Sequence, residues 1–145
     1  MKTIKRLLSL ALVLAVAAGY APGTPANTSY AQWVETFATV SGTQYQPGSV
    51  MNLDYGVQNH SASTQDIVFA GIIRFSDNSM IVAQPQESMT LLSGDGVIRF
   101  GSFVLPQDAP LGPAEFIVGA YVRGPSDRLD GPRVVYDSDT FDIVR

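Results

Sequence analysis

Few residues in this chain of 145 could carry out catalysis. His60 is the only histidine, in the stretch QNHSAS, and the chain contains no cysteine. A serine nucleophile needs a histidine base within hydrogen-bonding reach, and Ser61 and Ser63 are near His60 in sequence. The chain lacks the Gly-x-Ser-x-Gly turn, however, and adjacent loop residues seldom face one another productively. We therefore expect no nucleophilic catalysis, and a solvated loop position for His60.

The thirteen acidic residues raise two other possibilities. Zinc, copper and iron sites use several His or Cys ligands, so the composition argues against them. Calcium takes carboxylate and carbonyl oxygens, and the densest acidic cluster flanks the expected last hairpin, with Asp127, Asp130, Asp137 and Asp139. Solvated turn acids are the simpler interpretation, since no helix–loop–helix calcium motif is present. A calcium site at these four aspartates stays open, and no other cofactor is expected.

Some pair of carboxylates could in principle hydrolyse a glycosidic bond. Thirteen acids on a small domain always offer one pair at a suitable separation, so this pattern is uninformative. A small secreted hydrolase is therefore the weakest of the functions considered, and we expect that the protein is not an enzyme.

Side chains for recognition are easier to find. Trp33 and Tyr45 lie near the first strand-like segment, where an aromatic ring can stack on a sugar or anchor an interface. A core position is favoured for Trp33, and Tyr45 is undecided. His60 and Arg128 lie in the polar segments 59–66 and 124–133, which we expect to be end loops. The predicted binding residues are therefore Trp33, Tyr45, His60 and Arg128, with an exposed sheet edge as another binding surface.

The sequence predicts that the elements that position these residues are β-strands. Short segments rich in β-branched and aromatic residues alternate with turn signals such as Pro47-Gly48 and Gly94-Asp95-Gly96. The segment 66–75, DIVFAGIIRF, is apolar on both phases and predicts a central strand covered on both sides. Pro85 is expected to end a strand, Gly101 to mark a bulge, and DSD at 137–139 to interrupt the last strand. Seven or eight strands are expected, with no helix after the leader.

The stretch 103–122, FVLPQDAPLGPAEFIVGAYV, joins two strand-like runs through three prolines. Because proline cannot donate to a strand ladder, a tight hairpin is excluded, and a rigid crossover between two sheets is expected. Together with YQPGSVMNLDYGVQNHS, this stretch resembles immunoglobulin-like modules of secreted bacterial proteins, including cell-adhesion-related and macroglobulin-type domains. The resemblance implies an all-β fold, an antiparallel Greek-key immunoglobulin-like β-sandwich, and a role in binding or assembly.

The first residues are typical of a secretory signal peptide. Lys2, Lys5 and Arg6 precede the apolar run 7–18, which is too short for a permanent membrane span. We expect a signal-peptide helix over 1–19, cleavage between 17 and 31, a flexible segment over 20–31 and the sandwich domain over 32–145. Without the leader the chain carries six arginines against thirteen acids, a net charge of −7. Such a surface is a poor partner for nucleic acid.

These observations predict an exported, non-enzymatic protein that binds or adheres at the cell surface or in the periplasm. The expected partner is a protein or a carbohydrate of the cell envelope, and self-association stays open. The alternative is a structural subunit of an extracellular filament or matrix. In that case the segment 20–30 of one copy would pair with the sheet edge of its neighbour.

Overall fold

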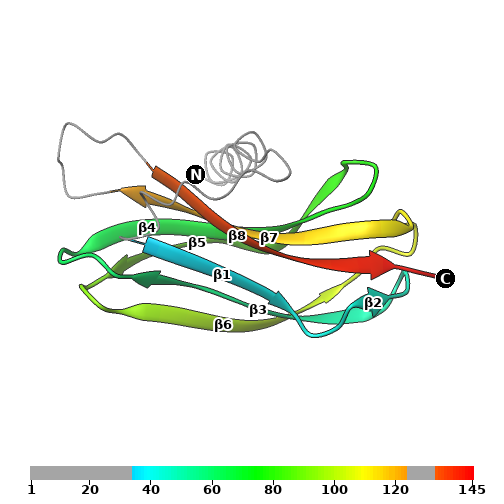
Figure 1. Cartoon of the computed structure of the whole chain (residues 1–145), viewed down its shortest axis with the longest axis horizontal. Helices are drawn as coiled ribbons and strands as arrows, with labels where there is room; N and C mark the ends of the chain where they lie inside the picture. The colour runs from blue at the N-terminus through cyan, green and yellow to red at the C-terminus, as the bar shows by residue number, and fades with distance from the viewer. Residues whose placement is uncertain (1–33, 124–132) are drawn as a thin grey trace, which may run out of the picture.

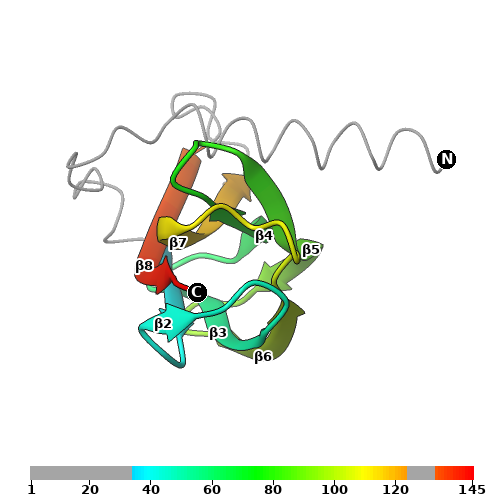
Figure 2. The ribbon, with the colours of Figure 1, turned by 90° about the vertical axis from the view of Figure 1, so that its right-hand side faces the viewer.

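The computed structural model describes residues 34–123 and 133–145, which form two stacked β-sheets (Figures 1 and 2). The three-stranded sheet has the order β1-β3-β6 and contains β1 (Val34–Val40), β3 (Val50–Asn59) and β6 (Gly96–Val104). The five-stranded sheet has the order β2-β8-β7-β4-β5 and contains β2 (Gln44–Tyr45), β8 (Arg133–Ile143), β7 (Gly112–Arg123), β4 (Gln65–Arg74) and β5 (Met80–Leu91). The predicted all-β, immunoglobulin-like β-sandwich of seven or eight strands is confirmed, with eight strands in the described residues.

All strand pairs are antiparallel except one. The short β2 pairs with β8 in parallel, through Gln44 with Asp142 and Tyr45 with Ile143. The predicted leader helix and the loop 124–132 lie outside the described residues. Within the two described ranges, no helix is long and apolar enough to span a membrane.

The proline-rich joint connects the two layers, as its sequence predicts. It follows β6 in the three-stranded sheet and precedes β7 in the five-stranded sheet. Leu105 and Ala109 are buried at the end of the core, and Ala109 donates its N–H to the carbonyl of Pro106 at 3.1 Å. The chain leaves the joint at Gly112, whose φ of 114° lies in the region that favours glycine.

The core between the sheets is centred on three aromatic rings. Tyr55 of β3 lies 6.0 Å from Phe69 of β4 and 6.3 Å from Phe116 of β7, measured between ring centroids. Strands β4 and β7 are also apolar on their outward phase, where Ile72 and Ile117 form a second, separate cluster. The expectation that segment 66–75 is a central strand is correct, because β4 lies between β7 and β5.

Three local predictions are wrong. Strand β5 continues through Pro85, because β5 is an edge strand and a missing N–H there breaks no ladder. No register shift occurs at Gly101, and the irregularity lies instead in the β4–β5 pairing around Gly71. Strand β8 is continuous through Asp137 and Asp139, whose side chains bond to a neighbouring strand rather than to their own turn.

Candidate functional site

Half of the predicted site residues can be placed. Tyr45, His60, Asp137 and Asp139 lie in the described ranges. Trp33, Asp127, Arg128 and Asp130 lie outside them. The four residues that can be placed do not gather at one site: Asp137 and Asp139 act together on β1, whereas Tyr45 and His60 lie in separate arrangements.

Asp137 and Asp139 hold the edge of the other sheet. Asp137 Oδ2 accepts the backbone N–H of Ala38 at 3.0 Å, and Asp139 Oδ2 accepts that of Val40 at 2.8 Å. These N–H groups lie on the edge of β1 that does not pair with β3, so they have no partner within their own sheet among the described residues. Backbone N–H groups that are withdrawn from water need such an acceptor. In residues 34–123 and 133–145 no group of three His, Cys, Asp or Glu side chains is arranged to hold a metal ion. Calcium at these aspartates stays a prediction.

Tyr45 and His60 make local contacts. The ring of Tyr45 meets that of Phe141 edge to face, with centroids 5.6 Å apart, and packs against the core. His60 Nε2 lies 2.9 Å from Glu35 Oε2, an exposed pair that contributes little to stability. Tyr45 therefore has a packing role, whereas His60 lies beside an acidic side chain on the surface.

In the predicted recognition loop 59–66, the polar residues Asn59, Ser61 and Gln65 are buried, and the others face solvent at least in part. Asn59 is fully buried, and its Nδ2 donates to the carbonyls of Ser63, Leu91 and Leu92 at 2.8–3.1 Å. Asn59 Oδ1 accepts from both the N–H and the hydroxyl of Ser61. This network provides hydrogen-bond partners for buried backbone carbonyl and N–H groups at the point where the chain crosses between the sheets. The loop is thus fixed from within, and only part of it faces solvent.

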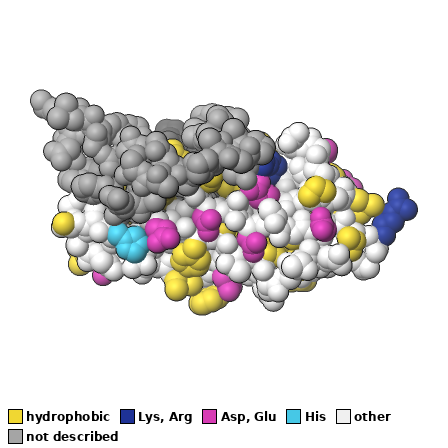
Figure 3. All heavy atoms as spheres, in the orientation of Figure 1, with side chains coloured by type: hydrophobic (Ala, Val, Ile, Leu, Met, Phe, Trp, Pro, Cys, Tyr) yellow, Lys and Arg dark blue, Asp and Glu magenta, His cyan; other side chains and the backbone are white. Residues whose placement is uncertain are grey.

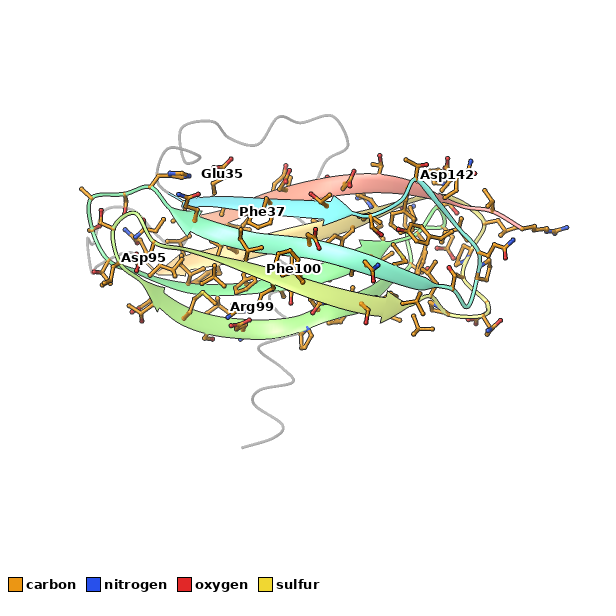
Figure 4. The ribbon with its side chains drawn as sticks, turned by 90° about the horizontal axis from the view of Figure 1, so that it is seen from below. Glu35, Phe37, Asp95, Arg99, Phe100 and Asp142 are labelled. Atoms are coloured by element: carbon orange, nitrogen blue, oxygen red, sulfur yellow. The ribbon has the colours of Figure 1, made fainter. Side chains whose placement is uncertain are left out.

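The most unusual surface lies on the outer face of the three-stranded sheet. Four large apolar side chains point outward there: Phe100 is 79% exposed, Val104 61%, Val50 59% and Ile98 57%. Phe37 of β1 lies on the same face, opposite Gly56 of β3, which in turn pairs with Ile98. We call these five side chains the outer apolar face. Figure 4 looks onto it, with Phe37 and Phe100 labelled.

Gly56 allows Phe37 to lie flat across the sheet. A Cβ at position 56 would stand 2.4 Å from Phe37 Cε1 and 2.2 Å from the carbonyl oxygen of Val97. The ring therefore occupies the place where another residue would carry its side chain. Because the ring covers a glycine, the outer apolar face is continuous from β1 to β6.

The charges around this face are negative. Asp54 pairs with Phe100 and Thr39 across the sheet, and Glu35 projects from β1 at the end of the same face. Arg99 of β6 points to the opposite side, where its guanidinium bonds both carboxylate oxygens of Glu87 on β5, at 2.6 and 3.2 Å. Figure 3 shows apolar side chains protruding along the lower margin, with acidic side chains and His60 beside them.

Sequence reasoning missed this face. In β6 the inward phase contains Val97 and Phe103, and the outward phase contains Ile98, Phe100 and Val104. A strand that is apolar on both phases normally predicts burial on both faces. The sequence signal that could have indicated this face is the second set of apolar residues in β6, at every other position after the Gly-Asp-Gly turn.

The comparisons with known proteins give a fold without a family. No protein-family model matches the chain, and no curated protein matches its sequence. The sporulation control protein Spo0M from Bacillus subtilis has a similar structure, with a TM-score of 0.53 and 18% identity over 77% of this chain and 49% of that one. The structure of the Pseudomonas fluorescens alkylpurine DNA glycosylase AlkC, bound to DNA with an abasic-site analog, is also similar. Its TM-score is 0.52 and its identity 14%, over 76% of this chain and 30% of that one. The C-terminal domain of Wzt has a TM-score of 0.49 and 16% identity, over 88% of this chain and 81% of that one.

The two stacked sheets and their strand order define the class of the domain, an immunoglobulin-like β-sandwich. The chain spans about half of Spo0M and less than a third of AlkC. At such identities the similarity concerns the fold alone, because one sandwich architecture serves many unrelated functions.

Proposed function

We propose that this protein is an exported, non-enzymatic binding or adhesion module that acts at the cell surface or in the periplasm. Its binding site is the outer apolar face, and its partner is another protein of the envelope. The leader-like residues 1–19 support export. The observation that carries the proposal is Phe100, a phenyl ring left 79% exposed beside Ile98 on the outer apolar face.

The exposed apolar side chains support binding. They form two groups, Ile98 with Phe100 and Val50 with Val104, separated by the Asn52–Ser102 pair. Exposed apolar groups of this kind, edged by polar side chains, often mark a binding surface. Aromatic side chains are the usual anchors of protein interfaces. Because Glu35 and Asp54 border the face, we expect a partner that combines apolar anchors with Lys or Arg side chains.

A protein partner is favoured over a carbohydrate. Sugar sites combine an aromatic platform with several fixed polar groups, which satisfy the hydroxyls of the sugar. On this face Phe100 has Asp54 opposite it and Ile98 and Ser102 beside it along β6. The Asn52–Ser102 pair lies between Phe100 and the Val50–Val104 pair. The large apolar side chains of this face match the core of a protein–protein interface more closely.

Site-specific photo-crosslinking in the producing cells tests this proposal. A benzophenone amino acid at position 100 should give a discrete adduct with another protein, whereas the same group at Ser88, exposed on β5, should not. With the photoreactive group at exposed position 98, Phe100→Ser should reduce the adduct about tenfold. No adduct at position 100, or equal adducts at 88 and 100, would refute the proposal. Adducts only between copies of this chain would refute partner binding and favour assembly.

A further inference from the structure

One side of the β6 backbone is unpaired within residues 34–123 and 133–145. Strand β6 is the last strand in the order β1-β3-β6, so its other edge has no neighbour in that sheet among these residues. Its pairing with β3 runs without a register shift from Val50↔Val104 to Gln58↔Gly96. A straight edge of nine residues is long enough to accept another strand.

The hydrogen-bonding phase of that edge follows from the two ends of the β3–β6 pairing. Leu105 donates its N–H to Ser49 at one end, and Asn59 donates to the carbonyl of Asp95 at the other. Residues of an antiparallel strand direct their N–H and C=O groups alternately to the two sides. The odd-numbered residues of β6 therefore bond to β3. The even-numbered residues present theirs to the open edge: Gly96, Ile98, Phe100, Ser102 and Val104.

The outermost strand on the same side of the other sheet is blocked. Strand β5 contains Pro85, which has no N–H, and its pairing with β4 shifts register around Gly71. Both features prevent a further strand from pairing along β5. Strand β6 has neither feature, and its single charged residue, Arg99, is engaged with Glu87 on the inner side.

We propose that two copies of this chain pair antiparallel along β6, around a two-fold axis at Phe100, to form a continuous six-stranded sheet. In this register Ile98 faces Ser102 of the second copy, and Gly96 faces Val104. All five residues whose N–H and C=O groups point to the open edge then form hydrogen-bonded pairs with residues of the second copy. The two phenyl rings at position 100 become direct neighbours on the outer face.

Charge and the aromatic pair favour this register over the two adjacent ones. A two-fold axis at Arg99 would place two guanidinium groups opposite each other, which is unfavourable. With the axis at Phe100, Arg99 faces Gly101 of the second copy, which has no side chain. An axis at Gly101 would place each phenyl ring opposite a serine and lose the aromatic pair. The register at Phe100 is therefore the one that pairs the two phenyl rings, and it opposes no like charges.

The dimer goes beyond the proposed function, because it doubles the outer apolar face on one surface. The rings of Phe100 stay on that face, so a partner can bind both halves at once with increased avidity. One strand pair buries less area than the ~1,600 Å² of a standard interface, so we expect dissociation in the micromolar range. Dimerisation should thus be concentration-dependent.

Paired cysteines test the register, because the natural chain has none. Residues 98 and 102 of opposite copies would have Cα atoms about 5.5 Å apart, within disulfide range. Two residues 98 would be about 14 Å apart. Mildly oxidised mixtures of Ile98→Cys and Ser102→Cys should form covalent heterodimers, and each variant alone should stay uncrosslinked. Crosslinking of either variant alone, or none in the mixture at concentrations where wild type is dimeric, would overturn the register.

Sedimentation of the protein purified from producing cells tests the dimer itself. Ser102→Pro removes an N–H directed to the open edge and leaves both Phe100 and the β3 ladder intact. It should weaken dimerisation at least tenfold, whereas Ser102→Ala should match wild type. A wild-type protein that is monomeric at 200 μM, or a Ser102→Pro variant that dimerises like wild type, would overturn the proposal; about 200 μM is far above the expected dissociation constant. Partner adducts at position 100 that persist in Ser102→Pro would show partner binding without the dimer.

Discussion

Replacing Asp139 with alanine removes one of the two carboxylates that hold β1 against β8. Asp139 Oδ2 accepts the N–H of Val40 at 2.8 Å, in a partly buried position. A hydrogen bond to a charged acceptor contributes about 1.5–3 kcal/mol, and partial exposure places this one near 1.5 kcal/mol. For a domain of roughly 100 residues that corresponds to a fall in Tm of about 6 °C. In the double variant that also carries Asp137→Ala, the Tm should fall about twice as far.

Urea unfolding gives the free energy, and hydrogen exchange gives the location of the change. Amides of β1 should lose protection, while those of β7 keep theirs. Ser138→Ala, between the two aspartates, is the matched control and should leave both measurements unchanged. An unchanged midpoint for Asp139→Ala, or equal loss of protection in β1 and β7, would refute the reasoning. If a chelator lowers the wild-type Tm by the same amount, the predicted calcium site at these aspartates gains support instead.

Three further perturbations test the core and the crossovers. Asn59→Ala should cost about 3 kcal/mol, because it leaves several buried backbone groups without their partner, whereas His60→Ala should cost less than about 0.5 kcal/mol by urea unfolding. Gly56→Ala should cost about 3 kcal/mol in the same assay, because the added Cβ meets the backbone of Val97 at 2.2 Å, and a cost below about 1 kcal/mol would contradict that contact. Burial, with the charge of Glu87 adding to it, raises the pKa of Tyr55 above its ordinary value. The unfolded chain therefore loses this proton first, so the contribution of Tyr55 to stability is present below about pH 10 and is lost as the pH rises further. Absorbance at 295 nm should show one late-titrating tyrosine that is missing in Tyr55→Phe.

The parts of the fold that follow from covalent constraints could be predicted from sequence. Proline removes an N–H whatever its surroundings, so the three prolines of the joint exclude a hairpin, and the joint does cross between the sheets. The two-phase apolar pattern of segment 66–75 correctly indicates a central strand. In β4, Phe69 and Ile73 pack between the sheets and Ile72 packs on the outside.

The parts that depend on a distant neighbour could not be predicted. Strand β6 has the same two-phase apolar pattern as β4, yet it lies at a sheet edge with Phe100 in solvent. Periodicity reports the two faces of a strand and not what covers them. The same limit applies to Asp139, whose partner Val40 is 99 residues away. Its carboxylate resembles a solvated turn acid until the fold brings β1 beside it.

The bonds from β8 to β1 also determine how the domain would respond to mechanical force. The bonds join Ala38 to Asp137 and Val40 to Asp139, so the two strands run side by side in the same direction, as Figure 1 shows. Tension applied at the start of β1 and the end of β8 would pull the first and last strands past each other. All these bonds, together with the parallel β2–β8 pair, would then be loaded at once in shear. A domain pulled from these two ends would therefore resist extension through the bonds of two aspartates to the edge of β1.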